Sequence, residues 1–272
     1  MFNARKIAPG VEHIEDAMGV CMTLIEGERE ALLIDAGYGL ESVSDFVRTR
    51  TEKPVRLILT HGHHDHILGA RWFAESWIHP AEMEEFLLRT GRDQRERVAD
   101  QARQKGVPVP ENFLTAAIPT PKPLEMSQHL GPFSSLRLPL GGREVWAIQV
   151  PGHTQGSLVF FLPEEGILLT GDDWNPCTWL WFPSSIGVRE WKQNMTRLLR
   201  VLETAGGKPV SRVLCSHQPT AREGEELTTF LDAVTEESIR NAHPVDMNST
   251  IQTCQIIFPR PEWTLIFDRA KA

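Results

Sequence analysis

The sequence lacks the features that mark membrane and secreted proteins. No run of apolar residues approaches the ~18 needed to cross a bilayer, and the longest, such as residues 158–162, have the length of a strand. Near the start, Pro9 and Gly10 stand where a secretory signal would need an apolar core of about 7 to 15 residues. We therefore expect a cytoplasmic protein that does not enter a membrane.

Paired thiols and clustered positive charge are also missing. The four cysteines are far apart and form no short paired spacing, which argues against a disulfide framework and a thiolate zinc finger. The formal net charge is −8 without a long basic run, whereas nucleic-acid binding usually needs Lys and Arg clustered on one face. A small-molecule substrate is the better expectation, with neither a nucleic-acid nor a membrane partner.

What remains is the composition of an ordinary globular protein. Apolar residues make up 41% and charged residues 24% of the chain, so there is enough apolar material for a buried core. We expect residues 1–272 to form a single domain.

Short apolar runs alternate with helical patterns along the chain. Residues 22–25 and 31–34 predict a β-hairpin that ends at Asp35, and residues 158–162 and 167–170 repeat this plan before Asp172. Further strands are predicted at 55–59, 145–150, 210–215 and 253–258, and apolar side chains recur at helical spacing over 188–202 and 227–234. This alternation indicates an α/β protein, and the repeated plan suggests two related halves in a pseudo-symmetric sandwich.

Residues 80–130 differ in composition from the rest of the chain. A charged helical stretch over residues 82–105 precedes a segment that contains six prolines, from Pro108 to Pro132. We expect a helical and proline-rich insertion here, which is either a lid over a pocket or a surface excursion.

A run of histidines, Thr60-His61-Gly62-His63-His64-Asp65-His66, directly follows the strand predicted at 55–59. In an extended segment, residues two apart point to the same side, so His61 and His63 can hold one metal ion together. If the chain turns after them, Asp65 and His66 can face a second ion. Imidazole and carboxylate ligands without thiolate suit zinc, and also iron or manganese. The alternative is a chance His-rich surface turn, but its place after a buried strand favours a metal site.

The spacing His61-x-His63-x-Asp65-His66 resembles the signature of the metallo-β-lactamase superfamily. The other parts of that pattern follow in the family's order: Pro151-Gly152-His153-Thr154-x-Gly156-Ser157, then Thr170-Gly171-Asp172, then Ser216-His217. The resemblance extends from about Asp35 to His217, and each motif stands at the end of a predicted strand. It implies the family's fold, an αββα sandwich of two mixed β-sheets flanked by helices.

The resemblance also implies a centre for two divalent metal ions, most readily zinc, with iron or manganese as alternatives. The implied ligands are His61, His63 and His153 for the first ion, Asp65, His66 and His217 for the second, and Asp172 as a bridge between both. Asp35 resembles the family's supporting aspartate and would orient a ligand or a loop.

Other residues with reactive side chains receive structural interpretations. His64 lies between ligand positions and is expected to point away from the metals. Cys177 follows Asp172 by five residues and is expected to be a buried, inert thiol. Histidines without a motif are expected to be exposed or structurally hydrogen-bonded: His13, His79, His129 and His243.

Four aromatic residues follow Asp172 within residues 174–182. A segment that leaves a bridging ligand must begin beside the metals, so Trp174 and Trp179 could wall an apolar pocket for an acyl or ring substituent. The alternative is that these aromatic residues belong to the core.

These residues and the resemblance together predict a binuclear metal-dependent hydrolase. A metal-bridging hydroxide would attack a carbonyl, and Asp65 would pass a proton to the leaving group. The expected substrate is a small ester, thioester or lactone, with a phosphate or sulfate ester as an alternative on the same site. A mononuclear iron persulfide dioxygenase-like oxidoreductase is the rival activity. A non-catalytic binding module ranks lowest, because all the implied ligands are present.

Overall fold

The computed structural model describes residues 1–272, and its contacts divide the chain into two compact units. Unit 1 comprises Met1–Met126, Arg137–Val145 and Ser216–Thr220. Unit 2 comprises Ser127–Leu136, Trp146–Cys215 and Ala221–Ala272.

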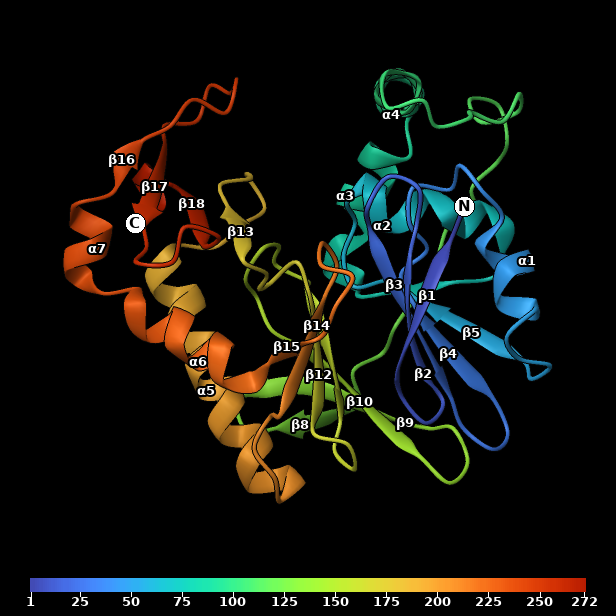
Figure 1. Ribbon diagram of the computed structural model, residues 1–272, viewed down its shortest axis with the longest axis horizontal. Helices are drawn as coiled ribbons and strands as arrows, with labels where there is room; N and C mark the ends of the chain where they lie inside the picture. The colour runs from blue at the N-terminus through green and yellow to red at the C-terminus, as the bar shows by residue number, and fades with distance from the viewer. The chain divides into compact units, whose positions relative to one another are not determined.

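Unit 1 is built on a seven-stranded mixed sheet, whose first five strands are blue in Figure 1. Its strands, in spatial order, are β1 (Asn3–Ala8), β2 (Val11–Glu15), β3 (Cys21–Glu26), β4 (Ala31–Ile34), β5 (Val55–Ile58), β6 (Trp77–Ile78) and β7 (Lys122–Pro123). Strands β1 to β4 pair antiparallel, and β4 to β7 pair parallel. The parallel strands end at the same edge, so the loops after β4 and β5 emerge side by side there.

Unit 1 also contains four helices and two 3-10 turns. They are α1 (Val43–Arg48), α2 (His64–Ile67), the 3-10 turns η1 (Leu68–Trp72) and η2 (Pro80–Glu82), α3 (Met83–Arg89) and α4 (Arg92–Gln104). Val47, Ile67 and Phe86, from α1, α2 and α3, share one apolar cluster with the buried strand residues Leu33 and Leu57. The histidine run of residues 60–66 therefore lies between a sheet edge and helix α3.

The predicted helical stretch over residues 82–105 is two helices rather than one. Helix α3 ends before Thr90, and α4 begins after Gly91. Phe86 of α3 packs in the sheet cluster, whereas Val98 and Ala102 of α4 pack in a second cluster with Leu68. Because the two helices bury their apolar faces against different parts of unit 1, the chain must bend between them.

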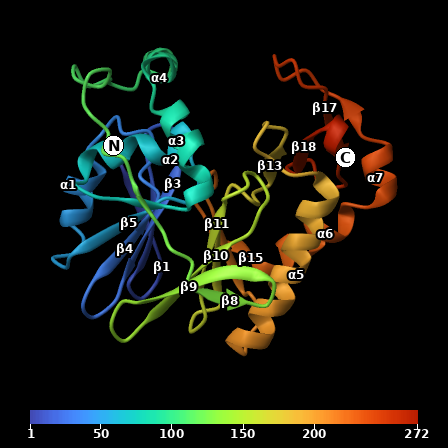
Figure 2. The same cartoon turned by 180° about the vertical axis from the view of Figure 1, so that it is seen from behind.

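Unit 2 holds a second mixed sheet, and Figures 1 and 2 show α5 and α6 running along it. The strand order is β15 (Arg222–Glu223), β14 (Arg212–Cys215), β12 (Ile167–Gly171), β11 (Leu158–Leu162), β10 (Glu144–Gln149), β9 (Phe133–Pro139) and β8 (Gln128–Leu130). Residues 137–145, the far ends of β9 and β10 with their turn, are counted with unit 1. Pairing is parallel between β12 and β14 and antiparallel between β10, β11 and β12.

A further small sheet and three helices complete unit 2. The sheet has the order β13 (Cys177–Leu180), β18 (Thr264–Asp268), β17 (Thr253–Ile257) and β16 (His243–Pro244). The helices are α5 (Val188–Gly206), α6 (Gly224–Ala233) and α7 (Glu236–Arg240), and the 3-10 turn η3 (Arg269–Lys271) ends the chain. Trp191 and Leu198 of α5 and Phe230 of α6 form the centre of the core of this unit.

The α/β class with two mixed sheets and flanking helices is confirmed, as are the two predicted hairpins β3–β4 and β11–β12. The predicted strands at 55–59, 145–150, 210–215 and 253–258 correspond to β5, β10, β14 and β17. Among the helices, none is long and apolar enough to cross a membrane.

Candidate metal centre

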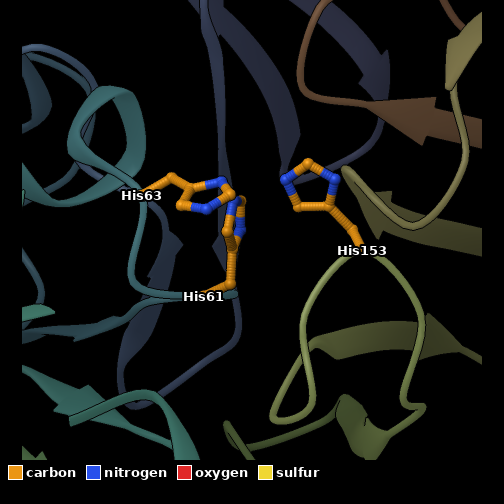
Figure 3. Close-up of side chains that lie close together, drawn as sticks. All are labelled: His61, His63 and His153. Carbon is orange, nitrogen blue, oxygen red and sulfur yellow. The ribbon is translucent and has the colours of Figure 1, made fainter. Parts of the chain in front are cut away.

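The histidine run occupies the junction between strand β5 and helix α2. His61 and His63 are on the short segment between β5 and the helix, with His63 as the N-cap of α2, and Asp65 and His66 lie within α2. The rings of His61 and His63 are 4.7 Å apart and those of His61 and His66 are 4.1 Å apart, measured between centroids. Figure 3 shows the His61 and His63 rings side by side on this segment. The chain turns at the start of α2, and this turn brings His66 close to His61.

The residue between the two histidines, Gly62, must be a glycine because no side chain fits at this position. A Cβ atom there would lie 2.8 Å from the Cβ of Glu85 and 2.8 Å from the backbone nitrogen of Phe86, both on α3. The backbone N–H of Gly62 donates to Oε2 of Glu82 at 2.9 Å, and Glu82 is almost fully buried. Helix α3 therefore fixes the backbone between His61 and His63.

Asp35, directly after strand β4, joins the start and the end of the histidine run. Its Oδ1 accepts from the backbone N–H of Thr60 at 2.7 Å, and its Oδ2 accepts from the Thr60 hydroxyl at 2.9 Å. The same Oδ2 lies 2.8 Å from Nδ1 of His66. Asp35 is 1% exposed and has a φ of +65°, an unusual backbone conformation that Asp tolerates better than most residues. A strained residue at a buried polar junction is typical of a functional site.

These contacts assign the protons of two imidazoles. The Thr60 hydroxyl has one proton, which it donates to Asp35, so its oxygen accepts from Nδ1–H of His61 at 2.9 Å. Nδ1 of His66 likewise donates to Asp35. Both rings then carry their lone pair on Nε2, which is the state in which neutral histidine binds a metal.

His217 also belongs to unit 1, in the segment Ser216–Thr220. The backbone N–H of Cys21 donates to the carbonyl of Ser216 at 2.7 Å, and Nε2 of His13 lies 3.0 Å from the carbonyl oxygen of Gln218. His13 is thus structurally hydrogen-bonded, as expected. Oδ2 of Asp65 is 3.6 Å from Nε2 of His217.

Five of the predicted ligands therefore gather within unit 1. Oδ2 of Asp65 is also 3.6 Å from Nε2 of His66, and the ligand atoms of Asp65, His66 and His217 all lie within 4.8 Å of one another. The side chain of Asp65 is 13% exposed and that of His217 is 35% exposed, whereas His66 is fully buried. The solvent-accessible side of the group is formed by Asp65 and His217.

Helix α3 adds a carboxylate that the sequence analysis did not identify. Oε1 of Glu85 lies 3.4 Å from Nε2 of His63 and 2.7 Å from Nε of Arg89. The neighbouring imidazole of His63, together with the hydrogen bond from Arg89, lowers the pKa of the Glu85 carboxyl to about 2 against the opposing effect of burial. No sequence motif marks this residue, which follows His63 by 22 positions.

Unit 2 contributes His153, on the loop between β10 and β11. Its backbone N–H donates to Oδ1 of Asp173 at 2.7 Å, and its carbonyl accepts from the Ser185 hydroxyl at 2.7 Å. Nδ1 of the ring donates to the carbonyl of Trp179 at 2.7 Å, so the lone pair is again on Nε2. His153 is 2% exposed, and these contacts fix the orientation of its ring.

Asp172 follows strand β12 and lies next to His153 within the same unit. Its Oδ2 is 3.7 Å from Nε2 of His153, and it is 8% exposed. Asp173, the next residue, holds the His153 loop so closely that a Cβ on Gly152 would be 2.4 Å from its Oδ1. The supporting role of Asp173 was not predicted. The sequence feature that could have indicated it is the pair of consecutive aspartates, Asp172 and Asp173.

The donor groups in both units fit divalent metal ions. All are imidazole nitrogens or carboxylate oxygens, and in His61, His66 and His153 a protein oxygen fixes the tautomer that presents Nε2. A ligating histidine normally donates its other ring N–H in this way. His64 differs, because burial lowers its pKa to about 4 and its ring packs edge-on against Tyr38.

Two expectations for the segment after Asp172 require correction. Trp174 is fully buried and packs against Phe230 in the core of unit 2, so it does not wall an open pocket. The tight turn in which the Asp173 N–H bonds the carbonyl of Thr170 directs Trp174 inward. Cys177 is exposed rather than buried, because on β13 it alternates with the inward-facing Thr178.

Trp179 is 36% exposed and belongs to a cluster with Trp181 and Phe182, called the aromatic cluster here. The rings of Trp181 and Phe182 are stacked at 4.4 Å, and Phe182 meets the ring of His153 edge-on at 5.2 Å. Partly exposed aromatic side chains in contact with one another are typical of ligand-binding surfaces. The aromatic cluster therefore contacts a predicted metal ligand, His153, through Phe182.

The chain belongs to the metallo-β-lactamase superfamily, whose family model matches residues 17–217. With the buried His and Asp groups described above, it is a metal-dependent hydrolase of that fold. Acyl-coenzyme A thioesterase MBLAC2 from Gallus gallus is 27% identical over 209 residues, which is 71% of this chain and 70% of that protein.

Solved structures agree with the fold. The metallo-beta-lactamase from Pontibacter korlensis matches with a TM-score of 0.56 and 18% identity, over 85% of this chain and 98% of that one. The sec-alkylsulfatase Pisa1 from Pseudomonas sp. matches with a TM-score of 0.61 and 16% identity, over 86% of this chain and 41% of that one. At these identities the likeness establishes the fold and leaves the substrate open.

Proposed function

We propose that this protein is a binuclear metal-dependent thioesterase that acts on acyl thioesters. The observation that carries the metal-dependent part is the fixed tautomer of His61, His66 and His153, each of which donates one ring N–H to a protein oxygen. Thioester hydrolysis is supported by the 27% identity to a protein named acyl-coenzyme A thioesterase.

The proposed ligands are the seven that the family resemblance implies. They would be His61, His63 and His153 for one ion, Asp65, His66 and His217 for the other, and Asp172 for both. Zinc is the proposed metal, because this donor set has imidazole and carboxylate groups and no thiolate. When bound, two such ions supply a hydroxide near neutral pH and polarise the carbonyl under attack.

Asp65 is the proposed proton carrier. Its carboxylate is next to Nε2 of both His66 and His217, and at 13% exposure it is open to solvent or substrate. A thiol with a pKa of about 8.5 leaves readily as the thiolate, so thioester cleavage requires little proton donation from this residue. Its task is then to hold the attacking oxygen and to take up a proton.

The aromatic cluster is the proposed binding surface for the acyl group. It is apolar, partly exposed and in ring contact with His153 through Phe182. An apolar acyl chain on this surface would be removed from water at about 25 cal/mol for each Å² buried. This predicts that thioesters with larger acyl groups bind more tightly than acetyl thioesters.

The test is a metal analysis followed by a substrate series. We expect about two equivalents of zinc, and release of free thiol from acyl-coenzyme A thioesters that stops on chelation and returns with added zinc. Lactones, oxygen esters, phosphate esters and sulfate esters should be poorer substrates. Thiol-dependent oxygen consumption by iron-loaded protein, or turnover of sulfate esters without thioesters, would overturn the proposal.

A further inference from the structure

The histidines of unit 1 do not all have the same kind of partner. Nδ1 of His61 bonds the Thr60 hydroxyl, and Nδ1 of His66 bonds Asp35, both within the β4 and β5 strand ends. His63 instead faces the insertion, where Nε2 lies 3.4 Å from Oε1 of Glu85 on α3. Its contact is therefore made through the opposite ring nitrogen.

We propose that Glu85 is a positioning residue, which binds Nε2–H of His63 and so makes Nδ1 the metal-binding nitrogen of that ring. The inference rests on the metal centre of the proposed function and extends it to a residue outside the ligand motifs. A carboxylate that accepts from a ligating imidazole fixes the tautomer and the ring orientation, and it raises the basicity of the other nitrogen.

The surroundings of Glu85 fit this role. The side chain of His63 is 6% exposed and that of Glu85 is 18% exposed, so the contact is largely shielded from water. Arg89, one helical turn later, bonds the same oxygen at 2.7 Å and holds the carboxylate in place. A charge-assisted contact of this kind is stronger than one between neutral groups.

The backbone around the contact is also fixed. Glu82, the N-cap of α3, accepts a hydrogen bond from the N–H of Gly62, and the missing side chain of Gly62 lets α3 approach. Two contacts thus join the segment before His63 to helix α3 and its N-cap. They are the hydrogen bond between Gly62 and Glu82 and the close approach of Gly62 to Glu85. The insertion therefore contributes directly to the geometry of the histidine run.

The experiment compares metal binding by three variants, starting from metal-free protein. Zinc affinity is measured by competition with a chromophoric chelator for wild type, Glu85→Ala, Glu85→Gln and Glu84→Gln. Glu84 is exposed on the same helix and serves as the matched control. We expect Glu85→Ala to weaken the binding of one of the two ions by about 10- to 100-fold, Glu85→Gln to weaken it less, and Glu84→Gln to have no effect.

A spectroscopic readout separates positioning from a general loss of structure. In the cobalt-substituted wild type, we expect a strongly shifted, slowly exchanging proton NMR resonance from Nε2–H of His63. It should be lost in Glu85→Ala and displaced in Glu85→Gln, whose amide oxygen can still accept. In a His63→Ala background, Glu85→Ala should cause no further loss of zinc affinity.

The outcomes are distinct. Wild-type zinc binding with Glu85→Ala within twofold of wild type, or an unchanged resonance, overturns the role of Glu85 alone. Failure of the wild type to bind zinc overturns the proposed metal centre and this inference with it. If Glu85→Ala does not fold, Glu85→Gln decides, since unchanged affinity together with an unchanged resonance contradicts the proposal.

Discussion

The two units hold their candidate ligands by different kinds of contact. In unit 1, carboxylates support the histidines: Asp35 contacts His66, and Glu85 contacts His63. In unit 2, the ring of His153 donates to the backbone carbonyl of Trp179, and the aromatic cluster lies beside it. Charged partners strengthen metal binding, whereas a backbone carbonyl next to apolar rings leaves room for an uncharged ligand group. We therefore expect variants in unit 1 to change chiefly metal affinity and variants in unit 2 to change chiefly substrate preference.

The largest effect is expected from removing the first two histidines of unit 1. The double variant His61→Ala, His63→Ala should abolish hydrolysis and lose at least one equivalent of metal, because both rings belong to the proposed site of one ion. Elemental analysis and thiol release measure the two effects. His129→Ala, which removes an exposed histidine on β8, is the control. Full activity in the double variant would refute the ligand assignment.

Trp174→Ala tests the core of unit 2 without touching its open surface. The indole is fully buried against Phe230, so its loss should lower the free energy of unfolding by about 3 to 5 kcal/mol. Denaturant unfolding measures this change. In the folded fraction, KM should match the wild type. A raised KM with normal stability would return Trp174 to the substrate pocket.

Asp35→Asn tests whether charge at the centre of unit 1 matters to the metal. Asn also tolerates the positive φ, so the backbone conformation should persist. The amide has only one acceptor oxygen for the three hydrogen bonds from Thr60 and His66. Zinc affinity should fall by about 10- to 100-fold in chelator competition. Asp45→Asn, at an exposed position on α1, should leave it unchanged.

The smallest effect on stability and the most selective effect on substrate are expected from Trp179→Ala. Trp179 is 36% exposed, so little core packing is lost. KM should rise for thioesters with long acyl chains and change little for acetyl thioesters, because only the former extend over the aromatic cluster. Steady-state kinetics across a chain-length series provide the measurement. An equal change in KM at every chain length would contradict an acyl-binding role.

The sequence predicted the central strands well because their signals are local. A buried strand such as β11 is a continuous apolar run, and the hairpins were visible from run lengths and turn residues. Strands β1 and β18 were not predicted. β1 is half exposed and carries Arg5 and Lys6, so its composition resembles a loop, and it is ordered by pairing with β2.

The ligand candidates were also readable from the sequence, because the spacing of His61, His63, Asp65 and His66 is set by one strand end and one helical turn. The residues around them were not. Glu85 reaches His63 because Phe86 buries α3 against the sheet of unit 1, and this long-range packing leaves no local signal in the sequence.

By itself, the sequence determined which chemical groups the protein has for binding metal, since imidazole and carboxylate spacing within a loop is a local property. Only the tertiary structure decided how those groups are supported and which neighbours remain exposed. Trp174 and Trp179 look alike in the sequence, yet one lies in the core and the other lies at the surface. The physical reason is that burial depends on packing against α6, a helix some fifty residues later in the chain.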